Sequence, residues 1–233
     1  MTDEPSALEH FLRRDRQVVT MSLVFIVAFA WVYTIAGAGM GMSAFEMSRI
    51  PWTDMDGQSM NMAMSGPNSI LVLFVMWWVM MVAMMLPSAA PTILLTAALN
   101  RRSTSDHPPF GNTAFFALGY LFAWLIFSLV AAVAQWLLES NGLLSTMMNS
   151  KSNYLTAGLL LAAGIWQFSP IKQVCLRHCR SPFKFITSQR RSGNRGALRM
   201  GLHHGTYCLG CCWFLMALLF VGGVMNLFWI GLS

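Results

Sequence analysis

Two histidines and three cysteines stand close together near the C-terminal end of the chain. On a helix, at about 100° per residue, His204, Cys208 and Cys211 fall within about 60° of one another. Cys212 lies slightly off this stripe, and His203 points elsewhere. Imidazole nitrogen and thiolate sulfur bind soft and borderline transition metals. The spacing therefore predicts a metal or redox site on one helix face. The alternative is small buried cysteines beside a histidine pair at the membrane surface.

One helix cannot surround a metal ion, so a second helix must supply the remaining ligands. Gly201, Gly205 and Gly210 interrupt the same segment. Glycines remove side chains from a helix surface and let a neighbouring helix approach closely. The three glycines therefore predict close packing of another helix against this one.

Methionines form two ladders on an upstream apolar segment. Met76, Met80 and Met84 are spaced by four residues and share one helix face, and Met81 and Met85 form a neighbouring ladder. Thioether sulfur is soft and selects Cu(I), but methionine is also an adaptable filler of apolar gaps. In a bilayer core of about 30 Å, the ladders overlap in depth with the histidine and cysteine stripe. They serve either as copper ligands or as core packing.

A second group of methionines precedes that segment, in a stretch expected to lie outside the membrane. Met60, Met62 and Met64 form an M-x-M-x-M pattern. Thioethers keep their ligand character in an oxidising compartment, where thiols are lost to disulfides. The pattern predicts capture of Cu(I) at the outer face, and the alternative is an amphipathic loop lying on lipid.

The remaining cysteines form the pattern C-x-x-H-C, with Cys175, His178 and Cys179, in a basic stretch. These three side chains are soft or borderline metal ligands. Either they handle metal at the inner face or they are stable reduced thiols without a role. No cysteine falls in a predicted outer loop, which favours reduced thiols over a disulfide framework.

The composition indicates how these residues are positioned. The chain of 233 residues is 56% apolar and only 10% charged, against roughly 25% charged residues in soluble domains. Its mean hydropathy is +0.55. An ordinary soluble enzyme is excluded, and an all-α polytopic membrane helix bundle forming one domain, 1–233, is predicted. Because a span needs about 20 apolar residues, we expect five spans, at 18–40, 68–99, 113–138, 153–168 and 200–232.

The basic residues indicate the orientation of this bundle. The tail 1–17, the loop between the second and third spans, and the loop 169–199 together hold 13 of the 15 Lys and Arg residues. Positive residues collect on the cytoplasmic side. We therefore expect a protein of the bacterial inner membrane with its N-terminus in the cytoplasm and its methionine-rich loop 41–67 outside. The net charge of +6 therefore reflects orientation, and no nucleic-acid partner is expected.

Two classes of transporter are disfavoured. No acidic or basic residue falls in the middle of a predicted span, whereas proton-coupled transporters use such residues as relays. The chain also lacks a glycine-rich phosphate loop with lysine, which argues against an ATP-driven pump.

Three segments carry a family resemblance: the methionine ladders, the C-x-x-H-C stretch followed by Arg180 and Pro182, and the glycine, histidine and cysteine segment from Gly201. Together they resemble a bacterial family of predicted metal-binding integral membrane proteins. The resemblance covers roughly residues 18–232. It implies metal binding without a defined reaction, and a sixth span in the full-length protein. The chain is more loosely similar to eukaryotic copper transporters, only in having a methionine-rich outer segment, M-x-x-x-M on a span and soft ligands inside.

The leading functional hypothesis is therefore a membrane protein that binds Cu(I) and takes it up or relays it inward, with zinc or iron as alternative metals. Its expected partners are the metal ion, the lipid bilayer, and a copper chaperone or cuproenzyme. Two alternatives stay open. One is a redox or metal-dependent membrane enzyme with a thiol couple, or with histidines on haem or a catalytic metal. The other is an assembly factor that delivers copper to a cuproenzyme.

Overall fold

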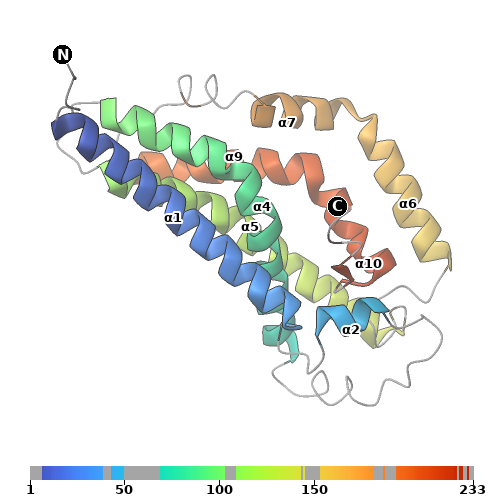
Figure 1. The fold of residues 1–233 in the computed structure, drawn as a ribbon. Coiled ribbons are helices and arrows are strands. Elements are labelled where there is room, and N and C mark those ends of the chain that lie inside the picture. The colour runs from blue at the N-terminus through green and yellow to red at the C-terminus, as the bar shows by residue number, and fades with distance from the viewer. Residues whose placement is uncertain are drawn as a thin grey trace.

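Helices make up the described part of the chain in this computed structural model, which covers residues 7–38, 43–49, 69–102, 109–142, 144, 153–180, 186, 193–224, 226, 227 and 230. This confirms the predicted all-α fold (Figure 1). The helices are α1 (Ala7–Ile35), α2 (Ala44–Arg49), α4 (Ser69–Arg102), α5 (Pro109–Ser140), α6 (Asn153–Gln167), α7 (Pro170–Arg180), α9 (Gly193–Ala217) and α10 (Leu219–Gly222).

Four stretches of helix are long and apolar enough to cross a membrane. They are 17–35 of α1, 70–100 of α4, 112–140 of α5, and 193–222, which joins α9 and α10. Helices α6 and α7 meet at a bend of 65°, and they give a fifth span when the bent pair is counted as one. The predicted membrane helix bundle of five spans agrees with this arrangement.

Two regions differ in detail from the sequence-based expectation. The segment expected as a fifth span at 200–232 begins earlier, at Gly193, and breaks at Leu218 between α9 and α10. Gly223 follows with a φ of 90°, a conformation that glycine adopts without steric cost. The region expected as an inner loop, 169–199, contains α7 and the beginning of α9.

Helix α5 lies at the centre of the bundle, between α4 and α9, and α1 covers the other side of α4. The α5 and α9 backbones touch. A Cβ atom on Gly201 would lie 1.9 Å from the Phe116 carbonyl oxygen, and one on Gly119 would lie 2.1 Å from the Leu198 carbonyl oxygen. The predicted close approach at Gly201 is therefore present, and its partner is α5 rather than the methionine-bearing α4.

Large apolar side chains cover the outside of the bundle as well as its core. Trp77 and Trp124 are buried, whereas Phe25, Tyr154 and Phe168 are mostly exposed. A soluble monomer rarely presents so much contiguous apolar surface. Such a surface is compatible with a hydrocarbon environment, where lipid chains cover apolar side chains and helices satisfy their own backbone hydrogen bonds.

A short polar chain joins α4 to α5 inside the apolar core. The indole Nε1 of Trp77 donates to Oε1 of Gln135 over 2.7 Å, and Nε2 of Gln135 donates to Oε1 of Glu139 over 2.8 Å. Trp77 and Gln135 are fully buried. The two side-chain donors of this chain therefore have the partners that an apolar interior requires.

Candidate metal centre

The histidine and cysteine stripe on α9 lies against the bundle. His204 and Cys208, one turn apart, are buried, and Cys211 and Cys212 are half-buried. The imidazole of His204 lies beside two α5 rings, with centroids 6.0 Å from Phe116 and 5.8 Å from Tyr120. From Ala197 to Cys208 the buried positions of α9 recur at intervals of three or four residues, which is the spacing of one helix face.

His203 lies outside this stripe, in agreement with its expected direction. Its ring meets the Tyr207 ring edge-on at 4.8 Å. On the other side, the His178 ring of α7 stacks on Tyr207, with centroids 4.1 Å apart and planes 3° apart. This stack fixes α7 against α9 at the residues that directly precede Cys179 and Cys208.

Helix α7 brings the other two cysteines to the same place. The Cys179 thiol lies within hydrogen-bonding reach of the thiols of Cys208 and Cys211. Cys175 lies over Gly210, where an added Cβ atom would be 2.8 Å from its sulfur. Thus Gly210 admits α7 rather than α5. The five thiols, all free of disulfides, form what we call the thiol cluster.

The sequence indicated two separate cysteine sites, one at the inner face and one within the membrane, and the structure brings them together. The 65° bend after α6 turns α7 toward α9 (Figure 1). Pro170, the first residue of α7, marks a helix boundary, but the sequence does not give the direction of the bend. Consequently, residues assigned by sequence to an inner loop lie beside Cys208 and Cys211.

Contacts within the thiol cluster centre on Cys208. Its sulfur is within hydrogen-bonding reach of the thiols of Cys179, Cys211 and Cys212. The thiols of Cys211 and Cys212 also donate to the carbonyl oxygen of Cys208, over 3.0 and 2.9 Å. Cys179, Cys208 and Cys211 each contact the other two, so they form a triangle of sulfur atoms from two helices.

The thiols are neighbours, but they are not arranged around a single metal position. As the side chains stand, no three His, Cys, Asp or Glu residues in the described part of the chain are placed to hold one metal ion. The thiols of Cys211 and Cys212 are engaged instead with the α9 backbone, through their hydrogen bonds to the Cys208 carbonyl oxygen. Rotation about χ1 moves a side chain between staggered wells without moving the helix, so these thiols can leave the carbonyl oxygen while α9 stays in place.

Tyr120 of α5 contacts the cluster and was not singled out from the sequence. It is fully buried, its hydroxyl donates to the Met85 carbonyl oxygen over 2.9 Å, and the same oxygen lies 3.4 Å from the Cys208 sulfur. The available signal was a tyrosine within an apolar span, because a buried hydroxyl needs a partner. Tyr120 thereby connects α4, α5 and α9 at one point.

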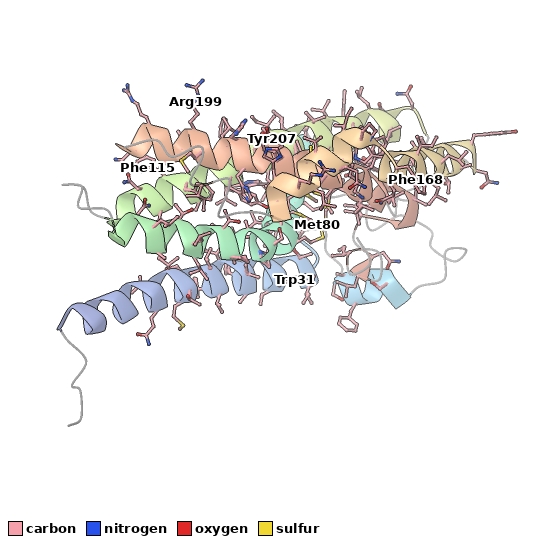
Figure 2. All side chains as sticks on the ribbon, turned by 90° about the horizontal axis from the view of Figure 1, so that it is seen from above. Trp31, Met80, Phe115, Phe168, Arg199 and Tyr207 are labelled. Carbon is pink, nitrogen blue, oxygen red and sulfur yellow. The ribbon has the colours of Figure 1, made fainter. Side chains whose placement is uncertain are left out.

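The methionine ladders of α4 lie in the core that the cluster borders. Met76, Met80 and Met81 are fully buried, and Met84 and Met85 are partly buried. They belong to the same continuous core as Cys208. Figure 2 shows Met80 between Trp31 of α1 and Tyr207 of α9. Helix α9 itself packs chiefly on α5 and α7, so Tyr120 provides the hydrogen-bonded link from α4 to Cys208.

The outer methionines Met60, Met62 and Met64 lie outside the described residues. Their expected role in capturing Cu(I) therefore stays a prediction.

Comparison with known proteins concerns the region that carries this site. Residues 74–233 match the PpoB2 family, which is described as copper chaperone. The chain belongs to this copper chaperone family. The matched region contains the methionine ladders, Tyr120 and every residue of the thiol cluster, and it gives the protein a copper-related function. No curated protein and no solved structure matches the chain.

Proposed function

We propose that the protein is a membrane copper chaperone that holds Cu(I) in the thiol cluster and relays it to an acceptor. The observation that carries this proposal is the meeting of cysteines from α7 and α9, which are far apart in the sequence. Soft thiolate ligands select Cu(I). Membership of the copper chaperone family supports copper as the metal.

The ligand set we propose is Cys179, Cys208 and Cys211, the three thiols that contact one another. Binding requires the Cys211 thiol to leave the Cys208 carbonyl oxygen, which exchanges one weak hydrogen bond for a metal–sulfur bond. His204, one turn before Cys208 on the buried face, is the nearest nitrogen ligand on α9. Cys175 lies beside this set but outside the triangle.

The route we propose leads from the methionines of α4 to the thiols. Met76, Met80 and Met81 offer neutral, soft sulfur atoms along one buried side of α4. Weak, repeated sites suit passage of an ion, because each must also release it. Thiolates carry charge and bind Cu(I) more strongly than thioethers, so transfer from methionine to the cluster runs downhill.

The orientation and the acceptor complete the proposal. The pattern of basic residues supports a location in the bacterial inner membrane with the N-terminus in the cytoplasm. The exposed Arg195 and Arg199 at the start of α9 fit a cytoplasmic position for that end of the helix. The description of the family favours an acceptor that itself requires copper, such as a cuproenzyme or a second chaperone. Copper is then taken up at the methionines of α4 and delivered from the thiol cluster to the acceptor.

Metal analysis of the purified full chain tests this function. We expect one copper ion per chain after loading with Cu(I) under reducing conditions, and loss of that copper in the Cys208→Ser/Cys211→Ser double variant. Met21→Leu, a change on the exposed surface of α1, serves as the matched control and should keep its copper. Zinc or iron in place of copper, or copper that survives the double substitution, would contradict the proposal.

A further inference from the structure

The thiol cluster holds more sulfur than the proposed Cu(I) site uses. Cys179, Cys208 and Cys211 form the triangle, and Cys212 contacts two of its members. All of these thiols are free. Two thiols in contact can bind a metal, but they can also give up two electrons and become a disulfide. These contacts raise the question of which pair of thiols is placed to react.

Geometry distinguishes the pairs. Residues three or four apart on a helix have Cβ atoms about 5–6 Å apart, whereas a disulfide needs about 3.5–4.5 Å. A bond between two cysteines of α9 would therefore distort that helix. Cys179 instead faces Cys208 from helix α7, and the residues that directly precede them, His178 and Tyr207, stack with ring centroids 4.1 Å apart. A disulfide between these two helices, at the α7–α9 seam, therefore does not require two cysteines of one helix to be drawn together.

The same seam offers a nitrogen ligand at its edge. Nδ1 of His178 lies 2.9 Å from the Val174 carbonyl oxygen. Because a carbonyl oxygen only accepts, Nδ1 carries the proton and Nε2 keeps its lone pair for a metal. His178 is half-exposed and directly precedes Cys179. Imidazole suits divalent copper, and thiolate suits Cu(I), so ligands for both oxidation states are adjacent.

We propose that the α7–α9 seam reduces Cu(II) to Cu(I) as it takes copper up. Two Cu(II) ions accept one electron each, and the thiols of Cys179 and Cys208 lose two protons and two electrons. Their two S–H bonds break and one S–S bond forms. While the disulfide stands, Cys211 and Cys212 keep their thiols and hold Cu(I), which moves to the triangle of Cys179, Cys208 and Cys211 when these thiols are reduced again. A dithiol reductant reopens the disulfide by thiol–disulfide exchange. This inference rests on the proposed copper function.

The test uses the full chain in detergent, reduced, freed of reductant and kept without oxygen. Copper(II) chloride is added, loss of Cu(II) is followed by electron paramagnetic resonance, and Cu(I) is followed by absorbance with bicinchoninate. The disulfide is located by alkylation and peptide mass spectrometry. We expect two Cu(II) lost and one Cys179–Cys208 disulfide formed per chain. Cys179→Ser should lose the fast reaction, and Cys175→Ser, on the same helix, should keep it.

Mapping in the unsubstituted chain keeps the test valid if a variant fails to fold. A persistent Cu(II) signal, a disulfide elsewhere, or an equal rate in protein unfolded by dodecyl sulfate would each overturn the inference. The proposed function is tested apart, by supplying Cu(I) directly under reducing conditions. Tight binding of Cu(I) without reduction of Cu(II) would remove this inference and leave the copper site in place.

Discussion

Gly210 gives the sharpest test of how α7 sits on α9. An alanine Cβ there would lie 2.8 Å from the Cys175 sulfur, and ordinary contact begins at 3.4 Å, so the sulfur must retreat by about 0.6 Å. Overpacking costs typically 1–3 kcal/mol. The obstructing atom is the end of a flexible side chain rather than backbone, so we expect the lower end, about 1 kcal/mol.

Because Cys175 and Cys179 share α7, a retreat of Cys175 that the helix takes up carries Cys179 away from Cys208, so Gly210→Ala should weaken Cu(I) binding. A loss of about 1 kcal/mol corresponds to about a fivefold rise in the dissociation constant. Competition between the reduced protein in detergent and a chromophoric Cu(I) chelator measures this constant. Thermal unfolding, measured in parallel, separates loss of the site from loss of the fold.

The control is a second substitution that removes the obstructing atom. Cys175→Ala deletes the sulfur that Gly210→Ala would strike, and Cys175 lies outside the proposed ligand triangle. The double variant should therefore bind Cu(I) as tightly as Cys175→Ala alone. If Gly210→Ala leaves binding unchanged, or if Cys175→Ala does not rescue it, the placement of α7 against α9 is wrong.

Three further substitutions separate the scaffold from the route. Gly201→Ala, whose Cβ atom would meet an α5 backbone oxygen at 1.9 Å, should prevent accumulation of folded protein, as judged by size-exclusion chromatography of detergent extracts. Gln135→Leu strands the buried Trp77 donor and should cost about 1–3 kcal/mol of stability in thermal unfolding, with unchanged Cu(I) affinity. Met80→Leu keeps volume at a cost below about 1.5 kcal/mol, but it should slow delivery of copper to an acceptor, whereas Met21→Leu should not. Normal delivery by the Met80 variant would remove α4 from the route.

The spans and the buried face of α9 were predictable because both depend on local periodicity. Long apolar stretches specify α4 and α5, and helical spacing places His204 and Cys208 on one face. Gly201 could also be assigned to a close helix contact, because glycine in a spanning helix allows backbones to approach. The sequence could not show which helix packs against Gly201, because nothing in the residues of α5 identifies it as the neighbour of α9.

The meeting of the two cysteine groups could not be predicted. It depends on the bend between α6 and α7, where Phe168 and Ser169 separate two helices at 65°. Such a bend is a property of tertiary packing, and α7 is held by the His178–Tyr207 stack and by the space over Gly210. Tyr120 was missed for a similar reason, because its partners, the Met85 carbonyl and Cys208, come from two other helices.

The claim that α7 and α9 build one copper site is tested most directly by a double-mutant cycle. Cu(I) dissociation constants are measured for the unsubstituted chain, Cys179→Ser, Cys208→Ser and the double variant. Ligands of one site should be strongly non-additive, with a coupling energy of about 1 kcal/mol or more, so the double variant should bind little more weakly than either single variant. Losses that simply add would mean two independent sites and would contradict the account.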